Sequence, residues 1–189
     1  KHRLPSISEG ISGIEFTRKV LFKGHWVRFG GFYPIHLLRL WRTGLGSCEQ
    51  RLMDEHIVLS AGETIRFKEH VIDENLNDMH WWVLKHNNYA RREAADALNL
   101  KYQLAFTTDL TTAGSSQAHV KRAAKNSFYN RLPLGLRAFI YFIFRFVFQL
   151  GFFDHPKVWM FHFMQGLWYR LLVDVNIYEA QKAAAHDSE

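Results

Sequence analysis

The spacing of apolar and polar positions changes along the chain, and it predicts strands first and helices later. Between residues 14 and 43, apolar residues alternate loosely with basic ones and are interrupted by glycines and a proline. This pattern is typical of short strands and loops. Residues 36–41 form a predicted strand, and residues 43–46 a turn. Two further apolar runs, at residues 56–60 and 64–72, flank an Ala-Gly-Glu loop and predict a β-hairpin.

The next segment has a helical period. From residue 79 to residue 98, Trp82, His86, Tyr89 and Glu93 recur on one face of a predicted helix. Residues 106–120 are small and polar and indicate a linker, and residues 121–129 are basic and predicted to be helical.

The C-terminal part is rich in aromatic residues. Residues 138–153 form an apolar run of about 16 residues, whereas a membrane-spanning helix needs roughly 20. Arg137, Tyr141, Arg145 and Gln149 recur every four residues and form one narrow polar stripe. A second such segment, residues 158–175, follows a proline. The pattern favours a helical hairpin lying in one leaflet of a membrane; the alternative is a buried helix pair in a soluble core.

Composition bounds the kind of partner. The formal net charge of +6 favours ligands that carry phosphate, such as sugar nucleotides or anionic lipid. The basic residues are scattered and match no nucleic-acid-binding module, so no nucleic-acid partner is predicted. The single cysteine, Cys48, excludes an intrachain disulfide.

Two local groups of residues are candidates for chemistry. Asp54, Glu55 and His56 place two carboxylates and an imidazole between a turn and a strand, where one carboxylate could act as a general base. The alternative is a solvated turn. On the predicted helix, Trp81 could stack on a sugar ring, and Lys85 or His86 could contact a phosphate. The alternative is a helix that packs its aromatic face and leaves its charges in water.

The chain has 11 histidines, but no His-Glu-x-x-His or Cys-x-x-Cys spacing marks a metal site. His70 and Asp73 lie close enough in the sequence to share a site, which is weak evidence for one.

The order of several motifs resembles a known family. These motifs are Gly24-His25-Trp26-Val27-Arg28, Gly30-Gly31-x-Tyr33-Pro34, Arg39-Leu40-Trp41-Arg42-x-Gly44, Met53-Asp54-Glu55-His56, Asp73-Glu74-Asn75-Leu76, Trp81-Trp82-x-x-Lys85-His86-Asn87-x-Tyr89-Ala90-x-x-Glu93, Gly166-Leu167-Trp168-Tyr169-Arg170, Asp174 and Tyr178-Glu179. Over residues 14–180, the chain resembles the C-terminal half of bacterial family-2 glycosyltransferases of envelope polysaccharide and lipopolysaccharide synthesis.

The resemblance implies an α/β fold: the C-terminal part of a GT-A, Rossmann-like domain, followed by amphipathic membrane-associated helices. It implies an inverting transfer from a nucleotide sugar to a lipid-linked or envelope glycan acceptor. The catalytic base falls on the Asp54–Glu55 pair, with Glu55 favoured and Asp54 open, and His56 orienting the carboxylate. Arg39 and Lys85 become candidate phosphate contacts, and Trp81 and His86 candidate substrate contacts.

The family also implies Mg²⁺ or Mn²⁺ held by an Asp-x-Asp motif, which this chain lacks. The chain starts at Lys1 and is therefore expected to be a fragment, with the nucleotide-binding half elsewhere. The alternatives are an inactive truncated transferase and a non-catalytic membrane-binding adaptor; a soluble helical domain is a weaker third. The expected location is the cytoplasmic face of the inner membrane.

Four regions follow from this interpretation. Residues 1–105 form the acceptor side of the catalytic domain, and residues 106–130 a linker with a basic helix. Residues 131–180 form the interfacial hairpin, and residues 181–189 a tail.

Overall fold

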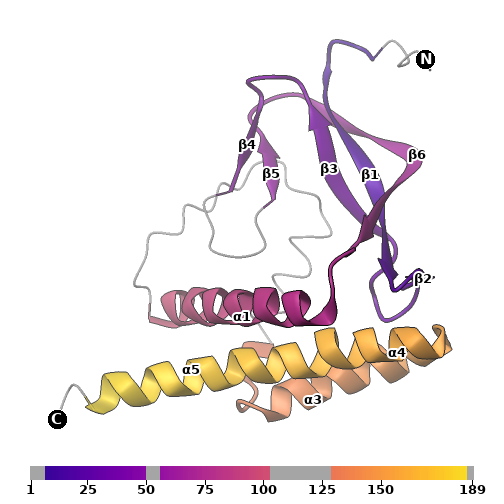
Figure 1. The fold of residues 1–189 in the computed structure, drawn as a ribbon. Helices are drawn as coiled ribbons and strands as arrows, with labels where there is room; N and C mark the ends of the chain where they lie inside the picture. Colours follow the sequence, from indigo (N-terminus) through magenta and orange to yellow (C-terminus); the bar gives the residue numbers. More distant parts are fainter. Residues whose placement is uncertain (1–6, 50–55, 103–128, 187–189) are drawn as a thin grey trace.

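The computed structural model describes residues 7–49, 56–102 and 129–186 (Figure 1). The strands come first: β1 (Ile11–Phe22), β2 (His25–Trp26), β3 (Ile35–Trp41), β4 (Gly46–Cys48), β5 (Ile57–Leu59) and β6 (Glu63–Glu74). The helices follow: α1 (Met79–Tyr102), η1 (Tyr129–Arg131), α3 (Leu136–Ile143), η2 (Phe144–Phe148), η3 (Gly151–Phe153), α4 (Pro156–Phe163), η4 (Met164–Trp168) and α5 (Tyr169–His186). The predicted strand at residues 36–41, the turn after it and the helix that starts at residue 79 are confirmed.

The long strand β1 is the centre of the main sheet. β3 and the short β2 pair with it antiparallel, and β6 pairs with it in parallel along its other edge. Nearly every side chain of β1 is buried or half-buried, because both faces of this strand are covered. The sequence predicted only short strands in this region, whereas β1 is a single strand of 12 residues.

The predicted hairpin between residues 56–60 and 64–72 is wrong. Both segments are strands, but β5 pairs with β4, and β6 pairs with β1. The glycine-containing loop between them therefore joins two separate sheets. A parallel strand needs a crossover connection, and the β4–β5 hairpin is part of this one.

The helices form two packed layers. Helix α1 lies along α5 (Figure 1), and the contact is made by Ala90 and Ala94 against Tyr169, Val173 and Ile177. The small alanine side chains allow the two helix backbones to approach closely. Of the four residues predicted to share one face of α1, Trp82 and Glu93 are buried.

The predicted polar stripe on the first aromatic helix faces the protein interior. Arg137 forms a buried ion pair with Asp174 of α5, and its Nε donates to that carboxylate at 2.7 Å. Further along, Arg145 Nη1 donates to the hydroxyl of Tyr141 at 2.8 Å. Outward-facing neighbours of this stripe are apolar and exposed, so the helix has its polar side inside and its apolar side outside.

A loop of the sheet is held tightly against the helices. The buried carboxylate of Asp154 accepts hydrogen bonds from the backbone N–H groups of Arg28 at 3.0 Å and Phe29 at 3.1 Å. It also accepts one from Nε2 of His162 at 2.8 Å. Gly30 has a φ of +66°, and a Cβ there would lie 2.5 Å from the ring of His162. Only glycine therefore fits where the loop and the helix meet.

An apolar core continues this contact between sheet and helices. Val20, Phe22, Val27 and Phe32 of the strands and their loop pack against Val158 and Phe161 of α4. Among the described residues, no helix combines the length and the apolar character needed to cross a membrane.

We expect Asp154→Asn to lower the free energy of unfolding by about 2–4 kcal/mol, because an amide replaces a carboxylate that accepts three buried hydrogen bonds. Urea unfolding followed by tryptophan fluorescence measures this loss. Asp73→Asn is the matched control, since its ion pair with Arg18 spans 3.5 Å and is largely exposed, worth less than about 1 kcal/mol. Equal losses in the two variants would show that Asp154 has no special role.

Candidate functional site

The predicted catalytic pair, Asp54 and Glu55, lies outside the described residues, so its geometry stays a prediction. The residues on either side of that segment contact each other. The backbone N–H of Glu49 donates to the carbonyl of His56 at 2.9 Å, and the N–H of His56 donates to the Glu49 carboxylate at 3.2 Å. The segment that carries the pair therefore joins β4 to β5 in the sequence.

Arg39 sits at an irregularity of the main sheet. Along β1, Ile14 pairs with Leu40 and the next residue, Glu15, pairs with Leu38, so Arg39 is the extra residue of a β-bulge. Bulges redirect side chains and are enriched beside functional sites. The side chain of Arg39 is exposed, which leaves it able to meet a ligand.

Exposed Trp81 and half-buried Lys85 form one pair on α1. The ammonium of Lys85 lies 4.8 Å from the centre of the Trp81 ring and 5.5 Å from that of Tyr89. Asp78 accepts from the N–H of Trp81 at 2.8 Å and fixes the start of the helix. An exposed indole beside a cation is suited to stacking on a sugar while contacting a phosphate.

His86 faces the opposite way. Its ring stacks on Trp82, with 3.5 Å between ring centres, and its edge meets Tyr169 of α5. Its Nδ1 donates to the carbonyl of Trp82 at 2.8 Å. These contacts match the alternative interpretation, in which the helix packs its aromatic face inward. The structure therefore separates His86 from Trp81 and Lys85, which were predicted to act with it.

Burial lowers the pKa of His86, because it penalises the charged imidazolium, and the charge of Lys85 lowers it further. Hydrogen bonds to Trp82 and Gln165 act in the opposite direction without reversing the shift. His86 is therefore held mainly neutral, which suits packing better than a phosphate contact.

His70 and Asp73 do not share a site. His70 Nε2 lies 3.0 Å from the hydroxyl of Tyr33, and Asp73 contacts Arg18 on β1. Within residues 7–49, 56–102 and 129–186, no three side chains of the metal-ligating types come together.

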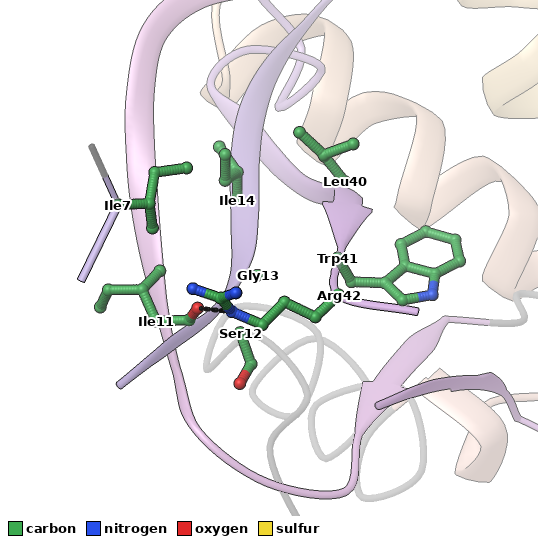
Figure 2. Close-up of a pocket in the computed structure, with 8 residues that line it drawn as sticks. All are labelled: Ile7, Ile11, Ser12, Gly13, Ile14, Leu40, Trp41 and Arg42. Atoms are coloured by element: carbon green, nitrogen blue, oxygen red, sulfur yellow. Dashed lines mark hydrogen bonds between the residues drawn. The ribbon is translucent and has the colours of Figure 1, made fainter. Parts of the chain in front are cut away.

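A pocket of about 390 Å³ opens where β1 begins and β3 ends (Figure 2). Its lining is mostly apolar, with Ile11, Ile14, Leu40 and Trp41 among its walls. The guanidinium of Arg42 is occupied at its edge, where Nε donates to the carbonyl of Ile11 at 2.9 Å. The pocket thus offers room for an apolar group and no evident catalytic side chain.

Glu93 is a buried functional candidate that the sequence placed only on a helix face. Its carboxylate accepts from the hydroxyl of Tyr169 at 2.7 Å and pairs with the guanidinium of Arg170. Its contacts Tyr169 and Arg170 belong to the Trp-Tyr-Arg motif of the C-terminal segment. Nothing in that motif indicates that it contacts Glu93.

Comparisons of the chain with protein-family models, with curated proteins and with solved structures find no match.

We expect the stability contributed by His86 to decrease as the pH falls below its ordinary pKa of 6.5. The pKa of this group is lowered in the folded chain, so the unfolded chain binds more protons in that range and is favoured there. The free energy of unfolding of His86→Gln, relative to the unchanged chain, should therefore improve as the pH falls from 7 to about 5. His80→Gln, at an exposed position of the same helix, is the control, and a pH-independent difference for His86→Gln would contradict the assignment.

Proposed function

We propose that this chain is the membrane-bound, acceptor-side part of an inverting glycosyltransferase that acts on a lipid-linked or envelope glycan. Two supports carry this proposal. One is the resemblance of its ordered motifs to family-2 glycosyltransferases. The other, and the observation that carries most weight, is the apolar outer surface of the helices between residues 136 and 163.

Two neighbouring helical segments expose large apolar side chains. Those with about half or more of their surface accessible include Phe148, Phe153, Met160, Leu136, Phe139, Phe144 and Phe163. Along α3 and η2, exposed apolar residues recur every three or four positions, at Leu136, Ile140, Ile143 and Val147. A surface of this kind is unfavourable in water and marks a site of membrane or partner contact.

The flanks of this surface suit an anionic bilayer. Arg28 lies at one edge, where its guanidinium stacks on Phe29, and the ring of Phe29 contacts Phe153. Lys157 is exposed in the first turn of α4. Trp159 is half-exposed while its Nε1 donates to the carbonyls of Phe152 and Asp154. Basic residues and amphipathic aromatics around an apolar face are typical of helices that lie in the membrane interface.

The chemistry of transfer follows from the resemblance. Glu55, or Asp54 in its place, would take a proton from the acceptor hydroxyl as that oxygen attacks the anomeric carbon of the donor. Exposed Arg39 and the Trp81–Lys85 pair would bind phosphate and sugar. A divalent cation, when bound in this family, offsets the charge of the diphosphate leaving group. The described residues do not fit such a site, so no metal ligand is assigned to this chain.

Replacing Phe148 or Phe153 by serine should weaken binding to vesicles by about tenfold each, because either change removes a large aromatic group from the membrane-contacting surface. Co-sedimentation of the chain with phosphatidylcholine–phosphatidylglycerol vesicles measures this effect.

Leu76→Ser is the matched control for these variants. Leu76 is 88% exposed but lies between β6 and α1, away from the helices that carry the apolar surface. Its replacement should leave vesicle binding unchanged. An unchanged chain that stays in the supernatant with anionic vesicles at low salt would overturn the membrane part of the proposal.

Glu55→Gln, introduced in the complete reading frame that encodes this chain, should lower sugar transfer by about 10²-fold or more, because the amide cannot accept the proton of the acceptor hydroxyl. Donor binding should remain near normal. The measurement is transfer of labelled sugar from a panel of nucleotide sugars to membrane lipids.

Asp54→Asn is the companion variant in that assay. Loss of transfer in Asp54→Asn alone would move the base to Asp54. Normal biological function after neutralisation of both carboxylates would favour a non-catalytic adaptor.

A further inference from the structure

The pocket between the start of β1 and the end of β3 offers a ligand both room and positive charge. Its volume of about 390 Å³ lies within the range of small-molecule sites, about 300–1,000 Å³. Since one molecule of liquid water occupies about 30 Å³, the pocket has room for roughly a dozen non-hydrogen atoms. The ligand that fits is therefore small, and its chemistry follows from the walls.

The walls of the pocket are mostly apolar, and part of them is open to solvent. Ile14 is buried, whereas Leu40 and Trp41 keep 45% and 36% of their surface accessible. The ring of Trp41 packs directly on the backbone of β4, because a Cβ at Gly46 would lie 2.4 Å from it. An apolar group in the pocket would cover side chains that now face water, against a wall that is already in place.

Arg42 brings a positive charge to this apolar pocket. Its Nε donates to the carbonyl of Ile11 at 2.9 Å, and its Nη2 donates to the carbonyl of Ser8 at 3.2 Å. Its backbone N–H donates to the carbonyl of Ser12 at 3.0 Å. Figure 2 shows the side chain reaching from the end of β3 to Ile11. Backbone groups at the start of β1 thus hold the guanidinium in one position.

One edge of this guanidinium remains open. The two bonds to carbonyls use the edge formed by Nε and Nη2, and a guanidinium has further N–H donors on Nη1 and Nη2. Within residues 7–49, 56–102 and 129–186, no side chain accepts from Nη1 and no carboxylate pairs with Arg42. Glu63 lies opposite Ile11 on β6, yet it forms no ion pair with Arg42. Arg42 therefore presents a fixed pair of donors and a charge without a direct counter-ion.

We propose that this pocket binds a small molecule that has an apolar body and one carboxylate group. The open edge of Arg42 offers two parallel N–H donors that match the two carboxylate oxygens, and its single charge matches a single negative charge. The apolar body would lie against Ile11, Leu40 and Trp41. A phosphate monoester, with about two negative charges, would bring a charge that Arg42 does not balance into mostly apolar surroundings.

The site is separate from the surface that we propose contacts the membrane. The helices that carry that surface join the sheet through Val20 and Phe22, near the opposite end of β1 (Figure 1). Ligand binding in the pocket therefore depends neither on membrane contact nor on sugar transfer.

Calorimetry of the full chain with two pairs of probes tests this site. Decanoate and 2-naphthoate carry a hydrocarbon chain and a fused ring on a carboxylate, and decanamide and 2-naphthamide are their neutral counterparts. We expect at least one carboxylate to bind about tenfold or more tightly than its amide, because only the carboxylate forms ion-paired hydrogen bonds with Arg42. No binding of either carboxylate, or equal binding of each carboxylate and its amide, would overturn the proposal.

Two variants assign the binding to the pocket. Arg42→Gln should remove the difference between carboxylate and amide, since it removes the charge. Leu40→Trp should weaken the binding of both by about tenfold or more, because the larger ring occupies the space of the apolar body. If Arg42→Gln fails to fold, since this side chain also holds the start of β1, Leu40→Trp decides the question. Unchanged binding in Leu40→Trp would contradict the site.

Phe148→Ser and Arg91→Gln are the matched controls. Phe148 is exposed on the apolar surface of η2, and Arg91 is exposed on α1. Both variants should bind the carboxylates as the unchanged chain does. A loss in Phe148→Ser as large as that in Leu40→Trp would show that the probes bind the exposed helices instead of the pocket.

The two carboxylates distinguish the kind of apolar body. Tighter binding of decanoate supports the site with an aliphatic acid as its ligand. Tighter binding of 2-naphthoate supports the site with an aromatic acid that packs beside Trp41.

Trp41 supplies an independent readout of where the ligand lies. Bromine quenches the fluorescence of an indole ring that it contacts, so a brominated derivative of the carboxylate that binds should quench the fluorescence of the chain. The part of this quenching that comes from Trp41 should be absent in Trp41→Phe. The same quenching in Trp41→Phe and in the unchanged chain would place the ligand elsewhere.

Discussion

The carboxylate of Asp154 is the interaction on which the joined sheet and helices depend. It accepts from two backbone N–H groups of the loop after β2 and from His162 of α4, and both the carboxylate and the His162 side chain are buried. Each of these donors would be left unsatisfied without it, and a buried unsatisfied donor costs about 1–3 kcal/mol. The apolar core beside it adds stability, but apolar contacts are not directional. The hydrogen bonds of the carboxylate therefore determine which residues of the loop meet the helix. Gly30 can then approach His162 more closely than any side chain would permit.

This attachment also explains the inverted character of the first aromatic helix. A helix on the surface of a soluble protein turns its apolar face inward, but here the inward stripe holds Arg137, Tyr141 and Arg145. Their partners are Asp174 of α5, the loop carbonyl of Gly30 and one another. The inner side of the helix is therefore satisfied by polar contacts, and the apolar side remains outside, where it forms the exposed surface that we propose contacts the membrane.

Local pattern was enough to predict the helix that starts at residue 79, the two aromatic helical segments and the alignment of the polar residues in one stripe, since a period of four positions places residues on one face whatever they contact. It did not predict that the stripe faces the protein interior. It was not enough for long-range pairing. Residues 64–72 have the pattern of a strand, and the short glycine-containing loop before them is typical of a β-hairpin, so the preceding strand was the expected partner. The observed parallel partner is β1, some fifty positions earlier, and nothing in the alternation of β6 encodes it. The surroundings of His86 were hidden from the sequence for a related reason: its chemistry suggested a ligand, whereas its neighbours on α1 and α5 are aromatic rings that pack against it.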